Sequence, residues 1–197
     1  MAKRLLDILG SLAGLLLLAL PGALVALAIR LDSPGPVFFR QERVGRHGRP
    51  FRIHKFRTMR VDAERSGQLT VGEDRRVTRV GRVLRAHRLD ELPQLIDVLL
   101  GDMSLVGPRP EVPRYVALYP ADLRQRVLAV RPGITDPASL AFRGEAEQLA
   151  AAADPEREYV EVILPRKLAL AADYADRASL WTDLALIWRT LGVLWTR

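Results

Sequence analysis

The fold is decided by residues 85–110, which read RAHRLDELPQLIDVLLGDMSLVGPRP. Proline is tolerated in the first turn of a helix, where its missing N–H costs no hydrogen bond, so Pro93 marks a helix start. Leucine and isoleucine then recur at helical spacing, and Gly101 suits the position just past a helix end. The stretch therefore predicts a helix with Pro93 in its first turn, then a strand and a rigid turn over residues 102–110.

Two adjacent carboxylates, Asp90 and Glu91, fall at the start of this predicted helix. The start of a helix carries partial positive charge, which stabilises carboxylates and also phosphates. Arginines surround the two acids, and Arg109 lies between two prolines that limit its backbone freedom and so reduce the entropy lost on gripping an anion. This combination predicts chemistry on a phosphorylated substrate bound with a metal ion.

The composition narrows the classes of site and partner. The chain has 197 residues, no cysteine and three histidines, which excludes disulfides and cysteine-based metal sites and disfavours a histidine-rich zinc centre. A hard cation held by carboxylates stays open. The net charge of +7 indicates an anionic partner: nucleic acid, an acidic membrane surface or a phosphorylated small molecule.

Residues 8–29 carry no charge and are long enough for a membrane helix, which needs about 20 apolar residues. A cleaved signal peptide is disfavoured because the run is too long and residues 32–34 do not form a small-residue cleavage site. Pro21 interrupts the middle, and basic residues flank both ends, which places both flanks in the cytoplasm by the positive-inside rule. These features favour a re-entrant helix over residues 1–32. A single spanning helix stays the alternative, since proline also occurs in transmembrane helices.

The remaining elements are predicted from turn residues and spacing. Short strands at 37–39 and 51–53, joined by the turn 45–48, predict a small β-hairpin. Thr78 is expected to cap a helix over 79–89. Further helices are expected over residues 111–119, 121–130 and 156–175, the last one interrupted by Pro165.

Basic side chains beside the carboxylates have two interpretations. Arginine recurs every third residue from Arg79 to Arg88, and a solvated helix face explains such a stripe as well as a binding role does. Arginines packed this tightly repel one another. Substrate phosphates bound between the stripe and the two acids would relieve this repulsion, which favours the binding role. Lys55 and Arg57 would ordinarily be solvated surface residues, and their closeness to the predicted site favours a function.

Tryptophans seven residues apart, at positions 181, 188 and 195, share a face with Leu184 and Leu191. Such a stripe usually marks a core helix, but tryptophan prefers the membrane interface and polar residues occupy the other side. We expect residues 179–197 to form an amphipathic helix on the bilayer surface.

Six motifs in this order resemble the monotopic bacterial phosphoglycosyl transferases, also called bacterial sugar transferases, over about residues 3–176. They are K-R-x-x-D at 3–7, S-P-G-P-V-F-F-x-Q-x-R-V-G at 33–45, K-F-R-T-M at 55–59, L-D-E-L-P-Q at 89–94, M-S-x-V-G-P-R-P at 103–110 and R-P-G-I-T at 131–135. The resemblance implies transfer of a phospho-sugar from a UDP-sugar to a polyprenol phosphate, giving UMP and starting glycoconjugate assembly. It also implies a compact, mostly helical α/β catalytic domain, here residues 33–178, on the cytoplasmic face of the bacterial inner membrane. The resemblance further implies that membrane lipids are partners of the chain, and it is compatible with a homodimer.

The resemblance also implies residue roles. Asp90 matches the nucleophile, which would form an aspartyl-phosphosugar, and Glu91 matches its neighbour that binds Mg2+, with Asp90 as a further metal ligand. Pro21 matches the break in the membrane helix. The basic residues expected to bind the substrate phosphates are Lys55, Arg57, Arg82, Arg85, Arg109 and Arg143.

The chain departs from the family pattern after residue 135, where Asp136-Pro137-Ala138-Ser139 replaces the usual glycine and later A-Q. This departure leaves the donor sugar open. Longer members carry extra spanning helices and a second domain before this core, so we expect this chain to be the minimal catalytic form. A membrane-anchored nucleic-acid-binding protein is the main rival, but no recognition helix or aromatic platform supports nucleic acid as a partner. A membrane scaffold would leave the paired carboxylates unexplained.

Overall fold

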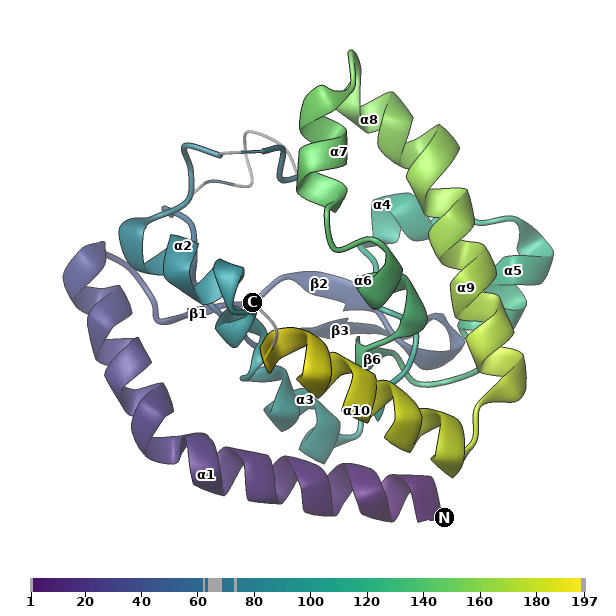
Figure 1. Ribbon diagram of the computed structural model, residues 1–197, viewed down its shortest axis with the longest axis horizontal. Coiled ribbons are helices and arrows are strands. Elements are labelled where there is room, and N and C mark those ends of the chain that lie inside the picture. Colours follow the sequence, from purple (N-terminus) through teal and green to yellow (C-terminus); the bar gives the residue numbers. More distant parts are fainter. Residues whose placement is uncertain (1, 62, 64–68, 73, 196–197) are drawn as a thin grey trace.

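The computed structural model describes residues 2–61, 63, 69–72 and 74–195. It is mostly helical with a few short strands near its centre, and one long helix, α1, runs along one side (Figure 1). The helices are α1 (Ala2–Asp32), α2 (Arg79–Ala86), α3 (Gln94–Leu100), α4 (Pro113–Val116), α5 (Ala121–Val127), α6 (Pro137–Ala141), α7 (Glu145–Ala151), α8 (Pro155–Glu158), α9 (Leu164–Arg177) and α10 (Leu180–Trp195).

The strands form three separate pairs. They are β1 (Phe38–Phe39), β2 (Glu42–Val44), β3 (Pro50–Arg52), β4 (Lys55–Phe56), β5 (Ser104–Val106) and β6 (Gly133–Thr135). β1 pairs with β4 and β2 with β3, both antiparallel, whereas β5 and β6 are parallel.

The predicted hairpin has the right turn but the wrong first strand. The turn at 45–48 joins β2 to β3, with Val44 opposite Pro50, and β1 pairs with β4 instead. The turn is tight, with the N–H of Gly45 donating to the carbonyl of Arg49 at 2.8 Å, so only the residues flanking it directly can pair across it. Residues 37–39 lie too far back along the chain and close an outer pair.

The central helix forms largely as its sequence predicts. α3 begins after Pro93, and Gly101 ends it in a left-handed backbone conformation (φ 93°) that favours glycine. Asp90 and Glu91, however, lie in a separate 3₁₀ turn over Leu89–Glu91 rather than in the α-helix itself.

The other predicted helices are present but shorter or divided. Thr78 caps α2 by accepting a hydrogen bond from the N–H of Gly81 at 3.0 Å. α2 ends at Ala86, and Arg88 has a left-handed backbone (φ 54°), so Arg88 leaves the predicted arginine stripe. The expected helix at 111–119 is α4 alone, and the one at 156–175 consists of α8, a wide turn over Tyr159–Ile163 and α9. Pro165 lies in the first turn of α9, where proline is tolerated.

α1 is 31 residues long and bends part-way along its length (Figure 1). Pro21 is the proline inside it, and proline is the usual cause of such a bend. α1 is also long and apolar enough to cross a membrane. Most of its leucines are exposed, whereas its buried residues are Asp7, Ser11 and Ile29. Its apolar side therefore faces outward and its small and polar side faces the protein.

The start of α1 is attached to the protein by polar contacts. The guanidinium of Arg4 donates to the carbonyls of Val98 and Leu99 at the end of α3, at 2.6 and 2.9 Å. The carboxylate of Asp7 accepts from the Ser104 hydroxyl and the Leu105 N–H of β5, at 2.9 and 3.0 Å. α1 thus holds two elements whose opposite ends lead to Glu91 and Arg109.

The main hydrophobic core lies away from α1, among the helices of the second half of the chain. Its buried residues are Val112, Tyr115, Val127, Leu149, Tyr159, Ile163, Leu164, Leu168, Ala171 and Ala172. α10 contributes little to this core: Trp181 and Trp188 are 81% and 76% exposed, while Asp183 and Leu186 are buried. The tryptophan stripe is thus an exposed face and not a core face; the side chain of Trp195 lies outside the described residues.

Candidate active site

Asp90 and Glu91 lie at the edge of a cavity of about 650 Å³. The 3₁₀ turn that carries them joins α2 to α3, and this turn leaves the two residues only 4% and 7% exposed. Two adjacent buried carboxylates are costly to keep ionised unless cations lie beside them. The cations come from two distant parts of the chain.

Lys55 is the first of these cations. It lies on β4, and its Nζ is 3.0 Å from Oδ2 of Asp90 and 3.1 Å from Oε1 of Glu91. The two carboxylates therefore converge on one ammonium group, which reduces their mutual repulsion.

Arg109 is the second cation. Its two terminal nitrogens donate to the two oxygens of Glu91, one bond being 3.1 Å long and the other shorter. Burial alone would raise the pKa of Glu91, but Arg109 and Lys55 outweigh burial and hold that pKa well below its usual range. The charge of Glu91 in turn raises the pKa of Arg109. Glu91 is therefore ionised and fixed in position by a bidentate partner.

Arg109 is placed by the close approach of β5 and β6. A Cβ on Gly107 would lie 2.3 Å from the carbonyl oxygen of Arg131, and one on Gly133 would lie 2.0 Å from the nitrogen of Gly107. Only glycine allows this contact, which explains the glycines in the V-G-P-R-P and R-P-G segments. The N–H of Arg109 also donates to the buried carboxylate of Asp136 at 3.2 Å.

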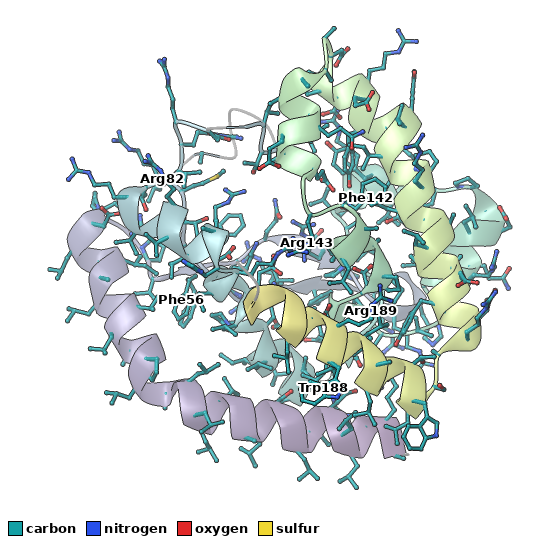
Figure 2. The ribbon with its side chains drawn as sticks, in the orientation of Figure 1. Phe56, Arg82, Phe142, Arg143, Trp188 and Arg189 are labelled. Carbon is teal, nitrogen blue, oxygen red and sulfur yellow. The ribbon has the colours of Figure 1, made fainter. Side chains whose placement is uncertain are left out.

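Further basic residues line the cavity. Arg82 on α2 and Arg143 after α6 both line it and come from separate parts of the molecule (Figure 2), and Arg85 donates to the Thr70 hydroxyl at 2.8 Å. Nine cationic and six anionic side chains line the cavity among the described residues, an excess of three positive charges. The cavity is thus suited to an anion. The sequence-predicted residues at the cavity are Lys55, Arg82, Arg85, Asp90, Glu91, Arg109 and Arg143.

Arg57 does not join this group. Its guanidinium donates to the carbonyls of Ser33, Pro34 and Pro36, at 2.6–2.8 Å, and so holds the turn that follows α1. It does not line the cavity. We therefore leave Arg57 out of the substrate-binding set discussed below. Pro21 lies in α1, within the apolar segment, and not at the cavity.

Several cavity residues were not singled out from the sequence. The hydroxyl of Tyr159 donates to Glu111 at 2.7 Å, and Arg43 lies 3.7 Å from the same carboxylate. Burial raises the pKa of Tyr159, so this phenol stays neutral and donates its proton. Arg43 could have been found through its place in the segment at 33–45, whereas no local signal marks Tyr159. The other charged cavity residues that were missed are Asp74, Arg75, Glu145, Glu147 and Lys167.

Asp90 and Glu91 are the candidate ligands for Mg2+. Among the described residues, no group of three acidic or histidine side chains is placed to hold a metal ion. Asp90 and Glu91 nevertheless present oxygens to one shared cation position, now taken by the ammonium of Lys55. Mg2+ is commonly held by one or two carboxylates together with substrate phosphates, so this pair fits an ion that arrives with a diphosphate.

Known proteins are similar to this chain over most of its length. A model of the bacterial sugar transferase family matches residues 1–197. A UDP-glucose:undecaprenyl-phosphate glucose-1-phosphate transferase of Caulobacter vibrioides is 42% identical over 92% of this chain and 65% of its own length. A UDP-N-acetylgalactosamine-undecaprenyl-phosphate N-acetylgalactosaminephosphotransferase of Aeromonas hydrophila is 46% identical over 68% of this chain and 32% of its own. An exopolysaccharide production protein of Rhizobium leguminosarum is 46% identical over 76% of this chain and 79% of its own length. The chain thus spans less than two thirds of the first two relatives.

Replacing Arg109 with glutamine should destabilise the protein in a pH-dependent way. In the native protein the lowered pKa of Glu91 stabilises the fold at any pH above the pKa that Glu91 has in the unfolded chain. This stabilisation is lost as the pH falls through the pKa of Glu91 in the folded protein. In the variant, burial would raise the pKa of Glu91 in the folded protein above its value in the unfolded chain. The stability of the variant would therefore rise as the pH falls through this raised pKa. The free energy of unfolding of the variant should be lower than that of the native protein by about 3 kcal/mol at pH 8, and this gap should be clearly smaller at pH 5.

Thermal unfolding in detergent at the two pH values measures this gap. Arg114→Gln is the matched control, because the Arg114–Glu156 pair is exposed and should contribute little at either pH. An equal gap for Arg109→Gln at both pH values would contradict the electrostatic account.

Proposed function

Because the chain belongs to the bacterial sugar transferase family, we propose that it moves a phospho-sugar from a UDP-sugar to a polyprenol phosphate, releasing UMP. The observation that carries this proposal is the cluster of Asp90, Glu91, Lys55 and Arg109 at the edge of a basic cavity. The relatives named for UDP-glucose and UDP-N-acetylgalactosamine differ in sugar, so the donor sugar is left open. The product would start assembly of an exopolysaccharide or a related glycan.

The basic walls of the cavity would bind the donor diphosphate. Arg82 and Arg85 from α2 and Arg143 from the segment after α6 would contact it. Guanidinium groups bind phosphate oxygens in pairs through charge-assisted hydrogen bonds. The donor would be drawn in by charge and turned so that its sugar-bearing phosphate faces Asp90.

The first half of the reaction would make a covalent enzyme intermediate. An oxygen of Asp90 attacks the β-phosphorus, the P–O bond to the α-phosphate breaks, and UMP leaves with the bonding electrons. Lys55, 3.0 Å from Asp90, offsets the repulsion between this carboxylate and the anionic donor. Among the described residues Asp90 pairs with Lys55 alone, whereas Glu91 is also gripped by Arg109. This difference favours Asp90 as the nucleophile.

The second half would regenerate the enzyme. A phosphate oxygen of the polyprenol phosphate attacks the phosphorus held by Asp90, the P–O bond to Asp90 breaks, and the free carboxylate returns. The acceptor is already an oxyanion, so no general base is required.

Mg2+ would be held by Glu91 and Asp90 together with the donor diphosphate, where its charge would offset negative charge on the phosphates. The convergence of both carboxylates on one cation position supports this assignment.

The outer faces of α1 and α10 support a proposed membrane placement. We propose that α1 enters and leaves the cytoplasmic leaflet of the inner membrane on the same side, with Pro21 at the bend, and that α10 lies along the surface. The exposed leucines of α1 and the exposed Trp181 and Trp188 support this placement. The acceptor phosphate lies at headgroup level, where a cavity held against the bilayer can reach it.

Replacing Asp90 with asparagine should lower UMP release by at least about a thousandfold, because the amide cannot act as nucleophile. The fold and membrane binding should persist. The exposed Asp102→Asn is the control and should keep full activity. Native enzyme incubated with donor alone should gain the mass of a phospho-sugar on the peptide that contains Asp90. Retained turnover in Asp90→Asn would remove Asp90 as the nucleophile.

EDTA should stop UMP release, and added MgCl2 should restore it, if the ion neutralises the diphosphate. The assay is UMP release from a panel of UDP-sugars with polyprenol phosphate. Undiminished release in excess EDTA would eliminate the metal requirement.

Single cysteines at Ala2 and Arg49 should both resist a membrane-impermeant thiol reagent added from outside whole cells, and both should react after permeabilisation. The chain has no other cysteine, so labelling is unambiguous. Labelling of Ala2→Cys from outside would indicate a spanning helix.

All three tryptophans lie in α10, so stronger quenching by lipids brominated near the headgroup than by deeply brominated lipids would place α10 at the surface.

A further inference from the structure

A hydrogen bond outside the proposed reaction, between His54 and the buried Asp97, joins the two segments that supply Lys55 and Asp90. The Nδ1 of His54 lies 2.5 Å from Oδ1 of Asp97, and the backbone N–H of His54 donates to Oδ2 of Asp97 at 2.8 Å. Asp97 lies on α3 and is 1% exposed. Both oxygens of one buried carboxylate are thus used to hold a single residue.

The location of this pair gives it its significance. His54 directly precedes Lys55 at the start of β4, and α3 directly follows the turn that carries Asp90 and Glu91. The contact between His54 and Asp97 therefore fixes the distance between the backbone of Lys55 and the backbone of the two carboxylates.

The surroundings strengthen the pair. Phe38 meets the His54 ring edge-on, with centroids 6.3 Å apart, and stacks on Phe56 with centroids 5.6 Å apart. Burial raises the pKa of Asp97, and the hydrogen bonds from His54 oppose that rise. With Asp97 ionised, the proton between the two lies on Nδ1, because a carboxylate only accepts. His54 serves here as a hydrogen-bond donor.

We propose that His54 and Asp97 form a positioning pair that holds Lys55 against Asp90 and Glu91 in readiness for the donor. The proposal rests on the proposed function for its kinetic consequence, but the placement of Lys55 can be measured without any substrate. Misplacing a group by about 1 Å can cost about a hundredfold in rate, so a loosened Lys55 should be felt in turnover.

The test uses the three lysines of the chain, Lys3, Lys55 and Lys167. Full-length protein in detergent is treated briefly with acetic anhydride, and acetylation of each lysine is followed by mass spectrometry of its peptides. In His54→Ala, Lys55 should react at least about three times faster than in the native protein, since its amine is no longer held between two carboxylates. Lys167 lies on α9 and pairs with Glu145 at 2.7 Å. Its acetylation rate should be unchanged, so it reports any general loosening of the protein.

A conservative variant separates positioning from acid–base chemistry. Asparagine places an N–H close to where Nδ1 lies, so His54→Asn should restore native Lys55 labelling and at least half of the native UMP release, whereas His54→Ala should lose about tenfold. Arg52→Ala, an exposed change two residues earlier on the same segment, should alter neither readout.

Three outcomes would overturn the proposal. They are unchanged Lys55 labelling in His54→Ala, an equal rise at Lys55 and Lys167, and failure of His54→Asn to restore labelling. If the native protein releases no UMP from any UDP-sugar while Lys55 labelling still responds to His54, the proposed function fails and the positioning pair stands.

Discussion

The buried pair between Glu91 and Arg109 is the interaction on which the rest of the structure depends. A carboxylate that is 7% exposed would be costly to ionise without an equally fixed cation. Arg109 supplies that cation only because β5 and β6 approach closely enough to require glycine at both contact positions. Lys55 completes the arrangement from β4. Three short segments are thus locked together by charge, and the same locking opens a basic cavity beside Asp90.

The start of α1 is attached to this arrangement by polar groups rather than by its leucines. Arg4 binds the carbonyls at the end of α3, where the helix dipole is negative, and Asp7 binds the exposed edge of β5. α3 begins next to Glu91, and β5 leads directly to Arg109. The position of α1 is therefore passed to both members of the central pair. An apolar attachment would slide more easily, because leucine packs against protein and lipid alike.

Local chemistry was predictable from the sequence, and long-range pairing was not. The start and end of α3, the Thr78 cap and the turn at 45–48 each depend on a few neighbouring residues. Lys55, Asp90 and Arg109 were expected to lie together because of a family resemblance, since nothing local links positions 55, 90 and 109. The partner of β2, the role of Arg57 in holding residues 33–36 and the His54–Asp97 pair all depend on which distant segments meet. Arg57 was expected to bind substrate because a basic residue near a site resembles a binding residue until its carbonyl partners are seen.

The cavity also bears on the order of events in the proposed reaction. Two phosphorylated substrates held about 4 Å apart would repel by about 4 kcal/mol for each pair of unit charges at an effective dielectric near 20. In the proposed reaction Asp90 would accept the phospho-sugar, and UMP would depart before the acceptor arrives. The same cations, Lys55 among them, would serve each phosphate in turn. Cations gathered beside the buried carboxylate of Asp90 are therefore better matched to the proposed covalent route than to a complex of both substrates at once.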